Sequence, residues 1–93
     1  MIVGTLRLQL VVRDAVTLKD KRRALKSFKD RVRNKFNVSI AEVDAQDHRQ
    51  RAILGVAMVA NDRRYVEGAL GQVVRAASTH RDMILMDQEL EWL

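Results

Sequence analysis

Residues 17–43 read TLKDKRRALKSFKDRVRNKFNVSIAEV, and this segment predicts a capped helix followed directly by a strand. Thr17 and Asp20 have the spacing of a capping box, in which each side chain accepts a hydrogen bond from the backbone amide of the other. Asn37, which tolerates the left-handed conformation, is the predicted end of the helix, and residues 38–43 are predicted to form a strand. The apolar side chains of the helix recur at helical spacing and form one stripe, Leu18, Leu25, Phe28, Val32 and Phe36.

Three more strands and two connections are predicted from the residues on either side. Residues 2–12 alternate between apolar and polar side chains, which is typical of a half-buried strand. Residues 51–60 are apolar on both sides, as in a strand that is central or covered on both faces. The polar residues 44–50 predict a turn, residues 78–82 predict a loop, and residues 83–93 predict the last strand.

A second amphipathic helix is predicted between the last two strands. Asn61 or Asp62 can cap its start. Gly68 and Gly71 lie opposite its apolar stripe, where we expect them to be tolerated in a weak helix rather than to mark a close backbone contact. The stripe consists of Val66, Ala69, Leu70, Val73 and Ala77. Together these segments predict one α+β domain over residues 1–93, in the order βαββαβ.

The composition excludes several classes of protein. The chain has no cysteine, which removes disulfides, thiolate zinc sites and cysteine nucleophiles. Hydrophobic residues make up 47% of the chain, which is enough for a core. The first residues have no basic region before a long apolar run, and no apolar stretch approaches the roughly 18 residues of a membrane span. We therefore expect a cytoplasmic protein that does not bind a membrane.

Positive charge is concentrated on the first predicted helix. The chain carries 17 Lys and Arg against 12 Asp and Glu, a net charge of +5. Residues 19–35 contain nine of the cations and two of the anions, so the rest of the chain is slightly acidic. On a helix with about 100° per residue, six cations fall on one flank beside the apolar stripe. They are Lys19, Arg22, Arg23, Lys26, Lys29 and Arg33.

Two interpretations of this cationic flank remain open. A row of Lys and Arg side chains is typical of a surface that binds nucleic-acid phosphates and releases counterions. Charge runs are also common on solvated faces that keep a protein soluble. Lys21 lies within the arc of the apolar stripe, and we expect its long side chain to extend out to water. The predicted nucleic-acid-binding residues are Lys19, Lys21, Arg22, Arg23, Lys26, Lys29 and Arg33.

No catalytic or cofactor-binding pattern accompanies the cations. The chain lacks the G-x-S-x-G, H-E-x-x-H and glycine-rich phosphate-loop motifs. The first and third strands carry none of the aromatic residues with which RNA-recognition motifs stack bases. Asp44, Asp47 and His48 are of the types that bind metals, but such residues are also common in polar turns, which is the interpretation that we prefer. We expect no enzyme activity, no cofactor and no metal site.

The sheet face away from the helices is a second candidate surface. The third strand would expose one of two apolar sets there, either Ile53 and Val59 or Leu54, Val56 and Met58. Monomers usually cover such a patch, so we consider a homodimer through the open sheet face. Arg7 could oppose an acid of the last strand across the sheet. The last strand carries three acids on one side, Asp87, Glu89 and Glu91.

Several runs of the chain resemble one family. Residues 17–22, TLKDKR, resemble its Ser-Leu-Lys-x-Lys-Arg opening of the first helix, with Thr17 in place of the serine and the cap chemistry retained. Residues 35–43, KFNVSIAEV, resemble its most recognisable stretch. The shorter matches are Asp47, QRA at 50–52, LGV at 54–56, ND at 61–62 and LEWL at 90–93. On these residues the protein resembles, over nearly its whole length, the YlxP-like family of small bacterial proteins, a domain of unknown function.

The resemblance implies a ferredoxin-like fold, a two-layer sandwich of a four-stranded antiparallel sheet with two helices on one face, and no established activity. Genes of this family often neighbour those for translation initiation and ribosome assembly factors, which suggests a ribosome-associated role by association rather than mechanism. The preferred hypothesis is a non-enzymatic protein that binds RNA or the ribosome (rRNA) through its basic first helix. The alternative is a homodimeric protein-interaction or regulatory module that binds an acidic protein partner.

Overall fold

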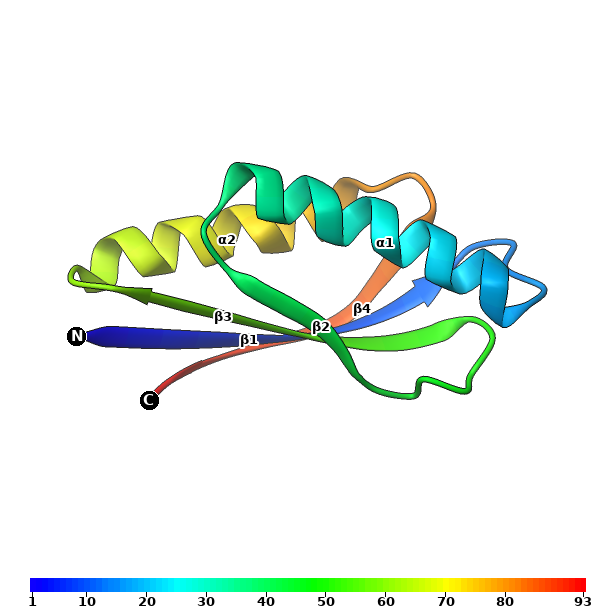
Figure 1. The fold of residues 1–93 in the computed structure, drawn as a ribbon, viewed down its shortest axis with the longest axis horizontal. Helices are drawn as coiled ribbons and strands as arrows, with labels where there is room; N and C mark the ends of the chain where they lie inside the picture. The colour runs from blue at the N-terminus through cyan, green and yellow to red at the C-terminus, as the bar shows by residue number, and fades with distance from the viewer.

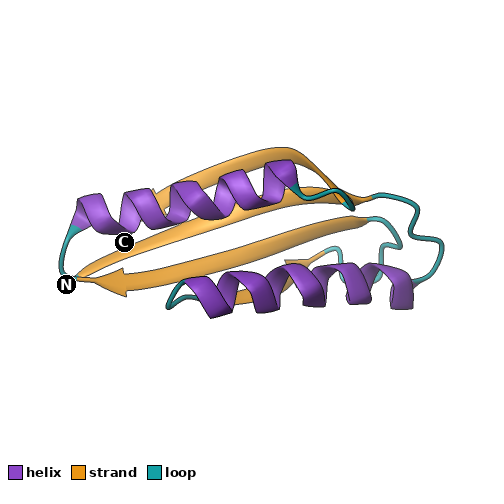
Figure 2. Cartoon of the chain, turned by 90° about the horizontal axis from the view of Figure 1, so that it is seen from above, coloured by secondary structure: helices purple, strands orange, loops and turns teal.

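The computed structural model describes all 93 residues and has the predicted βαββαβ order. Figure 1 shows both helices over one face of the sheet, and Figure 2 shows them from above, lying along the strands. The sheet is antiparallel with the strand order β2-β3-β1-β4, so β2 and β4 are its edges. The elements are β1 (Ile2–Val12), α1 (Leu18–Lys35), β2 (Ser39–Asp44), β3 (Arg51–Ala60), α2 (Arg63–Thr79) and β4 (Met83–Trp92).

The core lies between the helices and the sheet face that they cover. The alternation of β3 sends one apolar set into this core, Leu54, Val56 and Met58. The other set, Ile53 and Val59, therefore belongs to the open face, which decides between the two alternatives. Val59 is 57% exposed, whereas Ile53 is only 1% exposed. The apolar patch that β3 offers on the open face is thus smaller than the sequence indicated.

Several element boundaries differ from the sequence prediction by one or two residues. α1 ends at Lys35, and Phe36 already has an extended backbone with φ −130°, while its amide donates to the carbonyl of Val32. The Phe36 ring packs against the core, so the chain leaves the helix before Asn37, which does not take the left-handed conformation. β2 begins and ends one residue later than predicted, and α2 continues through the first two residues of the predicted loop 78–82.

The glycines of β1 and α2 differ in what surrounds them. A Cβ atom added at Gly4 in β1 would lie 2.8 Å from a methyl carbon of Val66, so α2 packs directly on the strand there. Cβ atoms added at Gly68 and Gly71 would meet nothing within 4 Å. The two helix glycines therefore lie on an open side of α2 and do not mark a close backbone contact, as the sequence indicated.

Candidate nucleic-acid interface

The first turn of α1 has the capping box that the sequence predicts. The Thr17 hydroxyl accepts from the Asp20 amide at 3.1 Å, and the Asp20 carboxylate accepts from the amides of Val16 and Thr17, both at 3.1 Å. These backbone hydrogen bonds hold the pKa of Asp20 below its usual value, because they stabilise the charged carboxylate. The start of the cationic helix is thus fixed by local sequence.

The predicted cations form a row along α1, and the Arg33 end of this row lies beside the edge strand β2. Arg33 defines this orientation, because its guanidinium donates to the carbonyl of Ile40 in β2 at 2.7 Å. The other side of α1 approaches the end of α2, where the Phe28 and His80 rings pack edge-on with 6.0 Å between centroids. Burial at this contact lowers the pKa of His80. We call the row of cations the basic flank; it consists of Lys19, Arg22, Arg23, Lys26, Lys29 and Arg33.

The rest of the chain neutralises the basic flank only in part, because Asp30 lies on it and Asp20 lies near Arg23. Five of its six residues are exposed, and Lys29 is partly buried. Asp30 is the one acid on the flank, and its carboxylate lies 2.6 Å from Lys26 Nζ and 3.6 Å from Arg33 Nη1. The hydrogen bond from Lys26 lowers the pKa of Asp30. The other four cations form no ion pair, and the acidic strand β4 lies at the opposite edge of the sheet.

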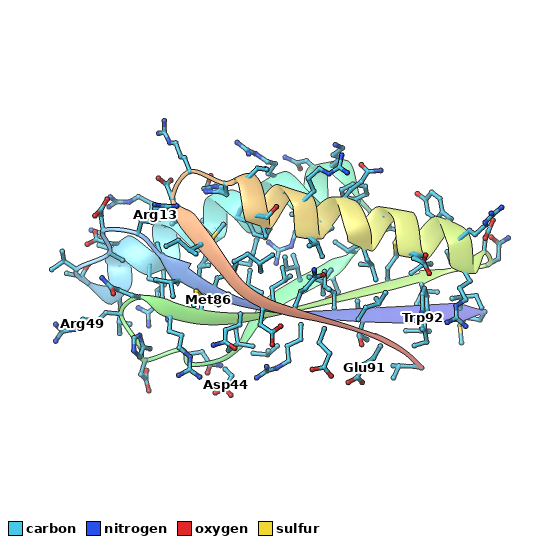
Figure 3. The ribbon with its side chains drawn as sticks, turned by 180° about the vertical axis from the view of Figure 1, so that it is seen from behind. Arg13, Asp44, Arg49, Met86, Glu91 and Trp92 are labelled. Carbon is cyan, nitrogen blue, oxygen red and sulfur yellow. The ribbon has the colours of Figure 1, made fainter.

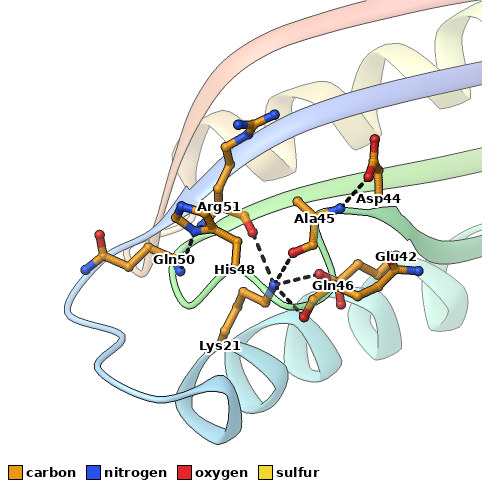
Figure 4. Close-up of polar contacts among 8 residues, drawn as sticks. All are labelled: Lys21, Glu42, Asp44, Ala45, Gln46, His48, Gln50 and Arg51. Carbon is orange, nitrogen blue, oxygen red and sulfur yellow. Dashed lines mark hydrogen bonds and ion pairs between the residues drawn. The ribbon is translucent and has the colours of Figure 1, made fainter.

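Lys21 does not belong to this surface, so its assignment to the nucleic-acid-binding residues was wrong. Its side chain is fully buried, and its ammonium is paired with the Glu42 carboxylate at 2.8 Å. The same ammonium donates to the carbonyls of Ala45 at 2.9 Å, Arg51 at 3.1 Å and Gln46 at 3.3 Å, as Figure 4 shows. The side chain turns inward rather than out to water, because the turn between β2 and β3 folds over it and supplies these acceptors. We call this arrangement the Lys21 clamp.

The polar segment between β2 and β3 is organised by its own side chains. His48 Nδ1 accepts from the amides of Gln50 at 3.2 Å and Arg51 at 2.9 Å. The Asp44 carboxylate accepts from the amide that follows it at 2.7 Å. No group of three or more His, Cys, Asp or Glu side chains is placed to hold a metal ion. The histidine and the aspartate therefore cap the turn that encloses Lys21.

No helix covers the other face of the sheet, although Ile53 on that face is only 1% exposed. The register places Arg7 of β1 opposite Glu89 of β4, but the two form no ion pair. Figure 3 shows Glu91 on this side of the sheet, whereas the adjacent Trp92 points toward α2, where the Arg63 guanidinium lies 4.4 Å from its ring centroid. A hydrogen bond with Glu91, together with the negative charge of that residue, raises the pKa of Glu89. The prediction that Arg7 lies opposite an acid of the last strand is confirmed by the register, although the two side chains form no ion pair.

The elements and their order define a small α+β protein with the ferredoxin-like fold. Two solved structures of designed proteins are similar in shape. De novo designed protein Ferredog-Diesel matches with a TM-score of 0.55 and 12% identity, over 96% of this chain and 83% of the designed one. De novo designed protein LFR1 1 with ferredoxin fold matches with a TM-score of 0.50 and 11% identity, over 100% of this chain and 84% of the designed one. At such identities the likeness is one of fold alone.

The chain belongs to the family described as Protein of unknown function (DUF503), which matches residues 3–90. It is 36% identical over 90 residues to the Uncharacterized protein YlxP of Bacillus subtilis (strain 168), and the match covers 97% of this chain and 98% of that protein. The resemblance to the YlxP-like family is thereby confirmed. Neither helix combines the length and the apolar character that crossing a membrane requires.

Proposed function

We propose that the protein is a non-enzymatic RNA-binding protein that contacts structured RNA, such as ribosomal RNA, through the basic flank of α1. The observation that carries this proposal is the excess positive charge of the flank, six cations against the carboxylates of Asp30 and Asp20. Like charges at helical spacing each cost a few tenths of a kcal/mol, roughly, and a polyanion relieves that repulsion. From Lys19 to Arg33 the row extends about 21 Å along the helix, which is enough to follow several phosphates of one strand.

The residue types on the flank favour contact with the RNA backbone rather than with bases. Lys and Arg side chains that bind phosphates position a protein but carry little sequence information. The flank has no aromatic side chain on which bases could stack, and the open sheet face has none either. Double-stranded RNA is recognised mainly by its shape, its phosphates and its 2′-hydroxyl groups. Helical stems are therefore the class of RNA that the flank fits.

Fluorescence anisotropy with a labelled RNA hairpin of about 20 base pairs tests this proposal. With about five phosphate contacts, the association constant should fall roughly 500-fold between 50 and 200 mM salt. The charge reversal Arg22→Glu/Lys26→Glu/Lys29→Glu should abolish binding. The matched control reverses three exposed arginines outside the flank, Arg64→Glu/Arg75→Glu/Arg81→Glu, and changes the net charge by the same amount.

Binding that does not depend on salt would contradict the proposal, as would the absence of binding to the hairpin. Equal losses in the two triple variants would also contradict it, because the effect would then follow from net charge and not from the flank. Circular dichroism of both variants verifies that they are folded before the comparison is made. Lys21 lies outside the proposed interface and is left unchanged in both variants.

The second candidate function is a homodimeric protein-interaction module, and the uncovered sheet face favours it. In this case the basic flank binds an acidic protein, and two copies meet through their open faces. A pull-down with and without nuclease separates the two candidates: partners lost after nuclease treatment support RNA binding, and partners retained support the interaction module. Sedimentation at increasing concentration measures the oligomeric state, and a monomer throughout the range would remove the homodimer.

A further inference from the structure

The open face of the sheet contains a hollow whose walls differ in character. The register forms a row from Ala41 of β2 through Gly55 of β3 and Arg7 of β1 to Glu89 of β4. Because the β2 and β3 positions in this row are small and the β1 and β4 positions are long, the surface is hollowed over Gly55. The hollow has a volume of about 400 Å³, and Val43 lies on the side of β2. A Cβ atom at Gly55 would lie 3.0 Å from the Val43 side chain, so glycine gives the hollow its depth.

The β4 wall of the hollow is acidic, and its two carboxylates exceed the single positive charge of Arg7, which also lines the hollow. Its side chains are Glu89 and Glu91, both of them exposed, and the exposed Asp87 lies further along the same strand, opposite Gln9. None of these carboxylates forms an ion pair, although Arg7 is the register neighbour of Glu89. Glu89 and Glu91 lie two residues apart on one face of the strand, and the pKa of Glu89 is raised because a hydrogen bond with Glu91, together with the repulsion between the two carboxylates, favours its protonated form. An external cation would relieve this repulsion.

We infer that the open sheet face binds a lysine- and arginine-rich segment of a partner protein, with apolar parts of the segment in the hollow over Gly55 and its cations against Glu89 and Glu91. Charge complementarity identifies this occupant, because an acidic wall repels RNA and other polyanions. The wall lies on the strand β4, at the opposite edge of the sheet from β2 and the basic flank. A basic protein bound to the same RNA would therefore meet the acidic wall, while the RNA itself meets the basic flank.

A second copy of the chain does not bring positive charges to the acidic wall. Two copies could meet through their open faces about a two-fold axis parallel to the strands. This axis places β4 of one copy over β2 of the other, so that Glu89 and Glu91 meet the uncharged Ala41 and Ser39. A two-fold axis across the strands places β4 over β4, so that carboxylates face carboxylates. Like charges that face each other across an interface oppose association. A basic partner matches the wall and a copy of this chain does not.

An NMR titration of the full chain, free of RNA, tests the inference. The probe is the peptide (Lys-Ala-Ala)4, with (Glu-Ala-Ala)4 as the acidic control. We expect the basic peptide to shift backbone amides along β1, β3 and β4 around the hollow, and the acidic peptide to cause no shifts. Glu89→Gln/Glu91→Gln should weaken binding of the basic peptide at least about fivefold. The matched control Asp14→Asn/Glu67→Gln removes two exposed carboxylates elsewhere and should change the affinity less than about twofold.

Three outcomes would overturn the inference. The first is binding of the basic peptide with chemical-shift changes only at amides away from the open sheet face. The second is an equal loss of peptide affinity in the two double variants. The third is no binding at 1 mM peptide, a concentration on the order of the weakest specific dissociation constants. Shifts of the same amides on raising the protein concentration, together with dimerisation in sedimentation, would instead assign the face to a second copy. Because no RNA is present, the result is independent of the proposed function, and failure of one leaves the other standing.

Discussion

Replacing Lys21 by methionine tests whether the Lys21 clamp holds α1 to the turn between β2 and β3. The Lys21 side chain is fully buried, and its partner Glu42 keeps only 14% of its side chain exposed. Lys21→Met preserves much of the volume but leaves three backbone carbonyls without this donor. It also leaves Glu42 Oε2 unpaired, because that buried atom has no hydrogen-bond partner apart from its ion pair with Lys21. Removing one partner of a buried ion pair costs about 3–5 kcal/mol.

We expect Lys21→Met to lower the free energy of unfolding by about 3 kcal/mol, the lower end of that range, because water reaches part of Glu42. A domain of this size has a total free energy of unfolding of roughly 5–14 kcal/mol. The variant should therefore remain folded with a reduced margin, and its Tm should fall by about 12–24 °C. Urea unfolding followed by circular dichroism measures the loss, and the slope m should be unchanged if the folded state stays compact.

Two further variants make this prediction specific. Lys19→Met alters an exposed cation of the same helix and should change the free energy of unfolding by less than about 0.5 kcal/mol. Lys21→Met/Glu42→Leu removes the unpaired carboxylate as well and should recover a large part of the loss. A loss below about 1 kcal/mol in Lys21→Met, or a double variant less stable than the single one, would refute the reasoning. In the folded variant, the salt dependence of RNA binding should match that of the unaltered protein, because the lysine does not reach the surface.

Four more predictions concern single positions. Gly71→Ala should stabilise the protein by about 0.5–1 kcal/mol, because the new methyl group meets nothing and the helix gains propensity. Gly4→Ala should destabilise the protein, because the added carbon would lie 2.8 Å from an α2 side chain. The Tm should therefore rise in Gly71→Ala and fall in Gly4→Ala. Thr17→Ala should cost about 1 kcal/mol through loss of the cap, and an unchanged urea midpoint would contradict this. Glu91→Gln should lower the pKa of Glu89 toward its ordinary value, as measured by NMR titration of the carboxyl carbon. A raised pKa means that the folded protein binds the Glu89 proton more tightly than the unfolded chain does. The stability that Glu89 contributes is therefore fully present below the pKa of the unfolded state and is lost as the pH rises through the pKa of the folded state. Glu91→Gln should reduce this pH dependence of the stability.

Much of the fold could be predicted from the sequence because it depends on local chemistry. Alternation in residues 2–12 and the apolar run at 51–60 gave β1 and β3 with the bounds that the structure has. The Thr17 capping box gave the first residue of α1. The six cations of the basic flank could also be identified, because the direction of a side chain around a helix follows from its spacing in the sequence. The end of α1 could not, because packing of the Phe36 ring against the core determines it.

Sequence by itself therefore determined which segments are helices and strands, and which cations share one side of α1. Only the tertiary structure decided that Lys21 is buried, since its acceptors lie 24, 25 and 30 positions further along the chain. It also decided that Gly55, Arg7 and Glu89 share a row, because strand order and register are set by packing across the whole sheet. Periodicity describes a residue relative to its near neighbours in the chain. Burial and cross-strand neighbours depend on contacts between distant segments, so the clamp and the acidic hollow became visible only in the folded chain.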